Sequence, residues 1–185
     1  MDNPSDNPIV RGLQLLTTGW GYNFYNRGNA ARADDLLVRE KAAHQLGEAA
    51  AALSALEVAY RRQFVPNPTR ENPYPPADAM ERLRAIGGLK ARISDVAVRI
   101  RGAATPTQDR IWFRLRNEQT LLYQLLTFDQ SLIAAAQQVS ELARTLTAAS
   151  WNQDPLSATA SFDLPLQQLD STIHDRTELL LMPTL

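Results

Sequence analysis

The sequence contains no cysteine, which excludes disulfide bonds, thiolate metal sites and cysteine nucleophiles. It has only two lysines, Lys41 and Lys90, and neither lies in a glycine-rich loop of the kind that binds nucleotide phosphates. The 19 basic and 20 acidic residues leave a net charge of −1, so no overall charge attracts nucleic acid or an anionic membrane. We therefore expect no nucleic-acid partner.

Long apolar runs are also missing. No stretch of about 18 apolar residues occurs, so the sequence predicts no membrane-spanning helix. The segment 1–8 is polar and acidic, whereas a secretory signal begins with positive charge followed by apolar residues. We accordingly expect a cytoplasmic protein. A length of 185 residues suits one domain that is large enough to bury a hydrophobic core without covalent cross-links.

Groups suited to catalysis are few. There is no Gly-x-Ser-x-Gly motif, and His44 and His174 are the only imidazole bases in the chain. The segment that begins with Gly19-Trp20-Gly21 does not match the Gly-x-Gly-x-x-Gly motif of dinucleotide-binding proteins, because Phe24 stands where the third glycine belongs. The sequence thus favours a non-enzymatic protein and predicts neither a cofactor nor catalytic residues.

What the sequence does contain is a helical period. Apolar residues recur in steps of three and four, which is typical of amphipathic helices. They predict three long helices over 30–65, 77–102 and 107–150, and two weaker terminal helices over 9–24 and 165–181. We expect an all-α fold: an elongated antiparallel helical bundle that forms one domain over 1–185, with 1–7 and 152–164 irregular.

The predicted helix over 107–150 would be about 65 Å long at 1.5 Å per residue. Because its partners are shorter, it should leave apolar surface uncovered and favour self-association. Glu118 and Asp129 interrupt its apolar stripe, and Arg114 lies one turn before Glu118. These carboxylates either serve acid–base chemistry or fix the helix register at the rim of the stripe, and we expect the second role.

Two breaks in the pattern predict local structure. The apolar spacing slips by one residue beside Gly87-Gly88, where we expect a kink or local unwinding. The segment 66–76 contains five prolines in eleven residues, which cannot be helical and which favour polyproline II. It is either a stiff connector between antiparallel helices or a docking motif for a partner's aromatic groove, and we expect a connector.

Two stripes of acid, histidine and acid occur at i, i+4 and i+8. They comprise Glu40, His44 and Glu48 in the second segment, and Asp170, His174 and Glu178 in the last. If the two stripes faced each other, they would offer two imidazoles and four carboxylates to a metal ion. The i, i+3 Glu-x-x-His motif of di-metal bundles is absent, so we expect no metal ligand and keep the metal site as an alternative.

Two further features suggest interactions. Trp20, Tyr22, Phe24 and Tyr25 are clustered beside glycines, as in a protein-binding hot spot, a segment packed on the core, or a cover over a small apolar ligand. We take these four as candidate partner-binding residues. Residues 88–118 carry a net charge of +4 and residues 150–185 carry −4, so the acidic tail is expected to dock on the basic hairpin.

These features together predict a non-enzymatic protein–protein interaction or scaffold bundle that self-associates, with a protein or a second copy as its partner. A metal-binding or metal-dependent bundle enzyme that uses His44 and His174 is the first alternative. A carrier of a small apolar ligand is the second.

Overall fold

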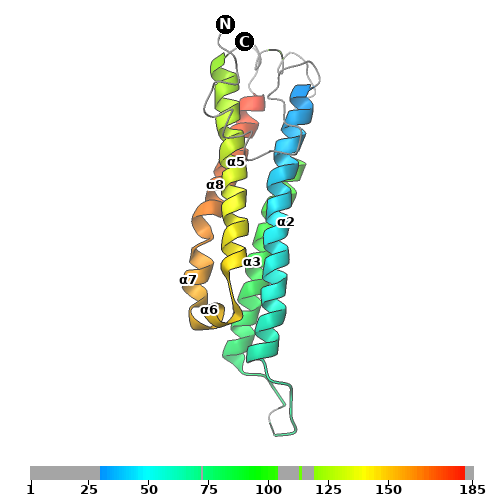
Figure 1. Cartoon of the computed structure of the whole chain (residues 1–185), viewed down its shortest axis with the longest axis vertical. Helices are drawn as coiled ribbons and strands as arrows, with labels where there is room; N and C mark the ends of the chain where they lie inside the picture. The colour runs from blue at the N-terminus through cyan, green and yellow to red at the C-terminus, as the bar shows by residue number, and fades with distance from the viewer. Residues whose placement is uncertain (1–29, 72, 104–112, 114–118, 182–185) are drawn as a thin grey trace.

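The chain is an elongated bundle of α-helices (Figure 1). The structure, a computed structural model, describes residues 30–71, 73–103, 113 and 119–181. It contains no strand within these ranges, so the predicted all-α fold is confirmed. None of the helices in these ranges is both long and apolar enough to cross a membrane.

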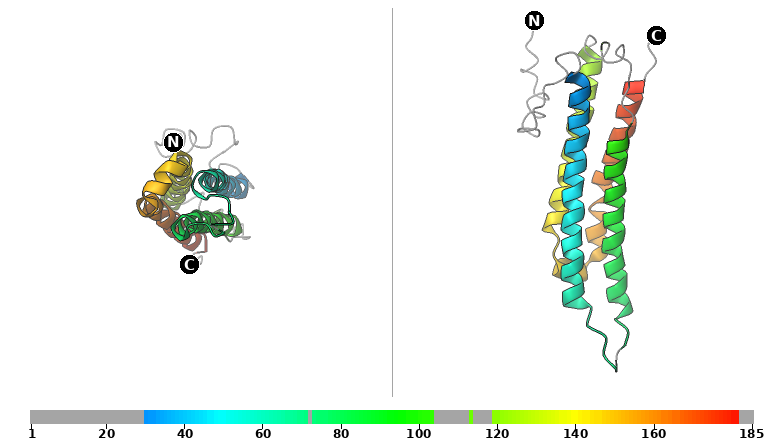
Figure 2. Two further views of the ribbon diagram at one scale, coloured as in Figure 1. Left: turned by 90° about the horizontal axis from the view of Figure 1, so that it is seen from below. Right: turned by 90° about the vertical axis from the view of Figure 1, so that its right-hand side faces the viewer.

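Four helices form the body of the bundle, and two short helices cross one end. In chain order they are α2 (Ala30–Phe64), α3 (Ala77–Gly102), α5 (Gln119–Thr145), α6 (Ala148–Gln153), α7 (Pro155–Ala160) and α8 (Asp163–Leu181). α2 packs against both α3 and α5, and α8 packs mainly against α5 (Figure 2). α2 and α5 are therefore neighbours that run in the same direction, while α3 and α8 run the opposite way (Figure 1).

The apolar stripes of α2 and α3 form the centre of the core as predicted. The buried side chains that form these two stripes are Ala42, Leu46, Ala49, Leu53, Leu56 and Tyr60 in α2 and Leu83, Ile86, Leu89, Ile93, Val96 and Ile100 in α3. Each large aliphatic side chain that is buried in this way contributes about 1.5–3 kcal/mol to folding. The proline-rich connector joins the ends of these helices, which run antiparallel, and most of its described residues, 66–71 and 73–76, are exposed.

Of the kink or local unwinding expected at Gly87-Gly88, the unwinding does not occur, because α3 is helical without a break from Ala77 to Gly102. Ile86 and Leu89 are both buried, although they are separated by three positions rather than four. A step of three rotates the next side chain by only about 60° around the helix, which keeps both residues on the core side. The change in apolar spacing therefore does not interrupt the helix, and the side chains on both sides of it stay in the core.

The prediction of one helix over 107–150 is also wrong at its C-terminal end. α5 ends at Thr145, and Thr147 has the extended backbone of a cap, with φ −116° and ψ 159°. The Thr147 hydroxyl accepts from the Ser150 backbone N–H at 3.1 Å, and the Thr147 N–H donates to the Ser150 hydroxyl at 3.1 Å. This reciprocal capping starts a new helix, α6, and lets the chain turn. Residues 107–112 and 114–118 lie outside the described ranges.

Residues 152–164 were expected to be irregular, and this expectation is wrong too. They contain the end of α6, the whole of α7 and the start of α8. Asp154 caps α7 by accepting from the Ser157 backbone N–H at 3.0 Å. Pro155 follows as the first residue of the helix, a position that needs no backbone N–H. A proline that would break a longer helix therefore begins a short one.

α6 closes the end of the bundle next to the proline-rich connector. Trp151 is fully buried, and its indole N–H donates to the backbone oxygen of Arg82 at 3.0 Å. The side-chain oxygen of Asn152 accepts from the Tyr60 hydroxyl at 3.0 Å and from the Arg82 guanidinium at 2.9 Å. α6 is thereby attached to both α2 and α3.

The C-terminal helix is an integral part of the bundle rather than a weak terminal element. Leu166, Leu169 and Leu180 are buried, and Ile173 is partly buried against the core. Two ion pairs join α8 to α3. They are Arg92–Asp163 at 2.6 Å and Arg99–Asp170 at 2.8 Å. The predicted docking of the acidic tail on the basic segment is confirmed, and it occurs within one chain.

Candidate functional site

Several of the residues that the sequence singled out lie outside the described ranges. These are the candidate partner-binding residues Trp20, Tyr22, Phe24 and Tyr25, together with Glu118. Partner binding by the aromatic cluster therefore stays a prediction, as does an apolar ligand beneath it.

The two acid–His–acid stripes do not form a metal site. His44 is exposed on α2, and the His174 side chain on α8 is 72% exposed and lies 3.4 Å from the Glu178 carboxylate. Stripe acids pair with arginines of neighbouring helices at 2.8–3.3 Å: Glu40 with Arg101, Glu48 with Arg144, and Asp170 with Arg99. Across the part of the chain that the structure describes, no three His, Asp or Glu side chains are grouped closely enough to hold an ion. These residues connect helices instead.

A buried cluster of charges joins all four long helices near one end of the bundle. Arg176 of α8 lies 2.5 Å from the Asp35 carboxylate of α2 and 2.6 Å from the Asp129 carboxylate of α5. Asp35 also pairs with Arg39 at 2.7 Å, and Arg39 donates to the backbone oxygen of Ala103, just after α3. All four charged residues are at most 4% exposed. Half of the buried polar and charged residues in the described ranges belong to this cluster.

The cluster differs from what the sequence suggested. Asp35 drew no attention as a core residue, and it lies in the second turn of α2, which begins at Ala30. Asp129 was expected at the rim of the stripe, but it is fully buried. The missing partner was Arg176, whose position three residues after Ile173 and four before Leu180 places it on the apolar face of α8. A basic residue within the apolar stripe of this helix is the sequence feature that could have predicted a buried ion pair.

Buried charges of this kind select one arrangement of helices more than they add stability. Taking each ion out of water costs several kcal/mol, which is offset only when every partner is in place. Arg176 meets carboxylates from two different helices, so a shift of α8 along α5 would separate it from at least one of them. We interpret the cluster as the feature that fixes how α2, α5 and α8 meet.

A second feature lies on the outside of α2. Seven exposed residues, spaced three or four positions apart, follow one another along its outer face. We call them the outer stripe: Glu40, His44, Gly47, Ala51, Ala55, Val58 and Arg62. Their spacing is four, three, four, four, three, four, which is symmetric about Ala51. The middle of the stripe consists of small apolar residues, and Val58 is 60% exposed. A helix face of this composition is suited to close contact with another helix.

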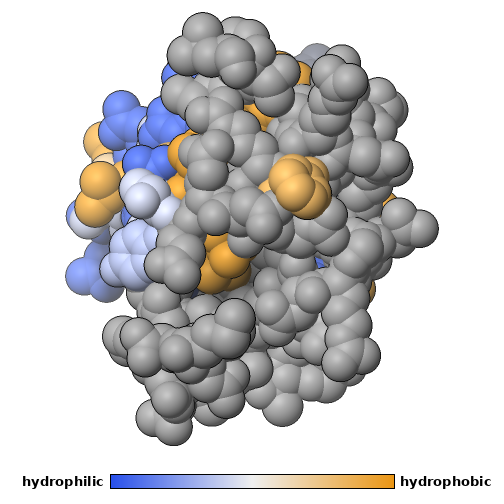
Figure 3. Space-filling model, turned by 90° about the horizontal axis from the view of Figure 1, so that it is seen from above, coloured by the Kyte–Doolittle hydropathy of each residue, from blue (hydrophilic) through white to orange (hydrophobic). Residues whose placement is uncertain are grey.

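Other exposed apolar residues are scattered. Leu36 and Leu181 are 56% and 55% exposed, near the start of α2 and the end of α8. Figure 3 views the bundle from this end and shows apolar surface beside hydrophilic residues. Isolated apolar side chains are normal on protein surfaces, so these do not by themselves define a partner site.

The fold and its surfaces define this chain as an all-α helical bundle with a charged core cluster. Comparisons with protein-family models, with curated proteins and with solved structures found no match.

Proposed function

We propose that this protein is a non-enzymatic helical bundle that self-associates through the outer stripe of α2. Two copies would pack with their α2 helices antiparallel, around a twofold axis that passes beside Ala51. The observation that supports this proposal is the symmetric spacing of exposed residues about Ala51, because a twofold interface must be complementary to itself.

The side chains of the stripe match when one copy is reversed on the other. With the axis at Ala51, residues that lie equally far before and after Ala51 face each other in the antiparallel pair. Glu40 of each copy therefore lies opposite Arg62 of the other copy, which places opposite charges at both ends of the stripe. His44 then meets Val58, and Gly47 meets Ala55. Glu40 also pairs with Arg101 of its own chain at 3.3 Å, but its side chain remains 52% exposed. The pairing therefore brings together opposite charges at the ends and small residues in the middle.

The size of the stripe predicts a weak and reversible dimer. From Glu40 to Arg62 it is about 33 Å long at 1.5 Å per residue, and a band about 10 Å wide gives a footprint of roughly 330 Å² per copy. A standard stable interface buries about 800 Å² per partner. Small residues allow the helix axes to approach to about 8 Å, the short end of the usual range. Association should consequently depend on concentration.

Multi-angle light scattering over about 10 µM to 1 mM protein tests this proposal. We expect the mass-average molar mass of the wild type to rise from 20.6 kDa toward twice that value. Ala51→Glu should stay monomeric over the same range, because it places two carboxylates against each other at the axis. Ala134→Glu puts the same charge on an exposed alanine of α5, away from the stripe, and should associate like the wild type.

A wild type that remains at 20.6 kDa up to 1 mM would contradict self-association. If the wild type associates and Ala51→Glu associates equally well, the protein self-associates through some other surface.

A further inference from the structure

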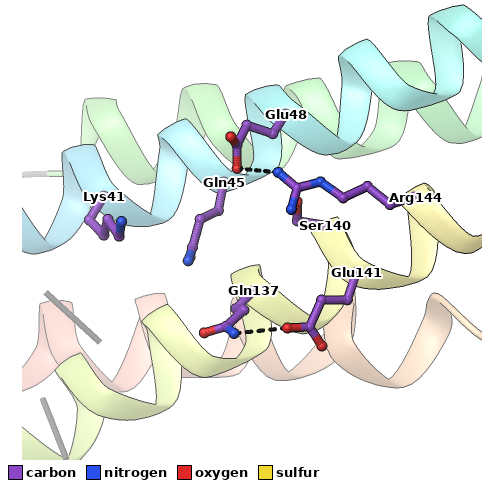
Figure 4. Close-up of a pocket in the computed structure, with 7 residues that line it drawn as sticks. All are labelled: Lys41, Gln45, Glu48, Gln137, Ser140, Glu141 and Arg144. Carbon is purple, nitrogen blue, oxygen red and sulfur yellow. Dashed lines mark hydrogen bonds and ion pairs between the residues drawn. The ribbon is translucent and has the colours of Figure 1, made fainter. Parts of the chain in front are cut away.

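Most arginines of this bundle have an acidic partner. Gln45 and Ser140 line a polar groove of about 330 Å³ between α2 and α5, and at its rim Arg144 pairs with a glutamate of α2 at 3.0 Å (Figure 4). The arginines that form ion pairs inside the described ranges are Arg39, Arg82, Arg92, Arg99, Arg101, Arg144 and Arg176. A guanidinium without an acidic partner is therefore an exception here.

The exceptions are gathered at the end of the bundle that carries the proline-rich connector. Among the arginine side chains that the structure describes, four are exposed and form no ion pair or hydrogen bond, and we call them the unpaired arginines: Arg61, Arg62, Arg70 and Arg84. Glu71 and Glu81 are exposed at the same end and form no ion pair with a described residue. Four arginines against two glutamates leave an excess of two positive charges, which the net charge of −1 for the whole chain conceals.

Three of the unpaired arginines lie on the outside of the α2–α3 hairpin. Arg62 ends the outer stripe of α2, and Arg61 precedes it on the same exposed turn. Arg84 lies one turn before Gly88, which is exposed on α3. At 1.5 Å per residue, Arg61 and Arg62 are within about 5 Å of the end of α2, and Arg84 is about 10 Å from the start of α3. A flat surface that lies along this end of the hairpin can therefore reach all three.

Tyr74 adds an exposed aromatic ring to the same end. It is 85% exposed, the highest value among the large hydrophobic side chains of the described ranges, and it lies between Pro73 and Pro75. Figure 2 shows the connector projecting beyond the ends of α2 and α3. Because prolines fix their own φ, the flanking residues limit how far the ring can fold back onto the bundle. An amphipathic ring beside cationic groups is typical of segments that lie in the headgroup layer of a membrane.

We propose that this end of the α2–α3 hairpin binds the surface of an anionic lipid bilayer. The unpaired arginines would donate to lipid phosphates, for which the planar guanidinium offers paired N–H groups, and the Tyr74 ring would enter the headgroup layer. The charges are spread over two helices and a connector. A fluid surface adapts to that spread, whereas a folded partner would need acidic groups at matching places. The proposal needs no membrane-spanning helix and is independent of self-association.

Co-sedimentation of the full-length protein with lipid vesicles tests the proposal. The probes are vesicles of phosphatidylglycerol mixed equally with phosphatidylcholine, and vesicles of phosphatidylcholine alone. We expect binding to the anionic vesicles at millimolar lipid, with the protein kept below the concentrations at which α2 should associate. Binding to the neutral vesicles should be about 25-fold weaker, or about fivefold for each excess positive charge. Added salt should release the protein, because it screens exposed charges.

A matched pair of triple variants separates this surface from charge in general. The variant with Arg61→Gln, Arg70→Gln and Arg84→Gln should bind anionic vesicles roughly a hundredfold more weakly than the wild type. Arg62 is left unchanged, because it also belongs to the outer stripe. The control carries Arg92→Gln, Arg99→Gln and Arg101→Gln, which remove the same charge from paired arginines of α3, and it should bind like the wild type. Thermal unfolding verifies that both variants are folded.

Single variants test the sign of the effect. Glu71→Gln should strengthen binding about fivefold, because it removes a negative charge next to Arg70. Tyr74→Ser should weaken binding about fivefold, because less apolar surface then leaves water. No binding to anionic vesicles at low salt, equal binding to both kinds of vesicle, or equal binding of the two triple variants would overturn the proposal. Tighter binding to double-stranded DNA than to the vesicles would assign the arginines to nucleic acid and overturn it as well.

Discussion

Replacing Arg176 by methionine should destabilise the fold more than any exposed substitution. The arginine pairs with Asp35 at 2.5 Å and with Asp129 at 2.6 Å, and all three side chains are at most 5% exposed. Methionine keeps the apolar stem but removes the positive charge, so two buried carboxylates lose their ion pairs with Arg176. Breaking a buried ion pair from one side costs about 3–5 kcal/mol. For a chain of this size, that loss lowers the melting temperature by about 10 °C.

Removing the second charge should restore part of the loss. In the double variant Asp129→Leu with Arg176→Met, no carboxylate of α5 remains in the cluster, and Asp35 keeps its pair with Arg39 at 2.7 Å. Because apolar replacement of a buried ion pair is often neutral, we expect the double variant to be at least about 2 kcal/mol more stable than Arg176→Met alone.

Urea denaturation followed by circular dichroism at 222 nm measures both free energies of unfolding. Arg99→Met is the matched control, since Arg99 pairs with Asp170 at 2.8 Å on a surface where both side chains are nearly half exposed. Exposed pairs contribute about 1 kcal/mol at most. The reasoning fails if Arg176→Met loses no more than Arg99→Met, or if the double variant is less stable than the single one.

Three further substitutions test local features by thermal unfolding. Thr147→Ala removes the cap of α6 and should lower stability by about 1 kcal/mol, whereas no loss would show that the cap does not hold the turn. Trp151→Ala should cost about 3–5 kcal/mol, because it empties a fully buried position and removes the bond to Arg82, and a loss under 1 kcal/mol would contradict its anchoring role. Gly88→Ala should raise stability by up to about 1 kcal/mol, since a Cβ there meets no atom within 4 Å and alanine favours helix, and a decrease would refute this.

The helices and their core faces could be read from the sequence, because burial of one face imposes a period that α2, α3 and α8 follow closely. The end of α5 at Thr145 could not, since the apolar stripe continues to Leu146 and only the pairing of Thr147 with Ser150 stops the helix. Periodicity reports which side chains face the core, but it does not report where the backbone changes direction. That depends on a few polar groups near the turn.

Polar features of the interior were predicted less well than apolar ones. The sequence marks Asp129 because this acidic residue interrupts an apolar stripe. It does not indicate the partner of Asp129, because Arg176 lies on another helix, 47 positions away. Such pairs depend on how helices are arranged around the core, which the period of a single helix does not determine. Likewise, the period of one helix could not show that Gln45 of α2 and Ser140 of α5 line the same groove, because this depends on α2 and α5 being neighbours.

Since the chain has no cysteine, single spin labels can be introduced on the outer stripe without a background label. Electron paramagnetic resonance of Ala51→Cys and Arg62→Cys at dimer-forming concentrations tests the central claim most directly. Antiparallel pairing about Ala51 predicts strong dipolar broadening for the label at 51, where the helix axes are about 8–10 Å apart. It predicts about 33 Å along the axis between labels at 62. No interaction between labels at 51, or equally short distances at both positions, would contradict it.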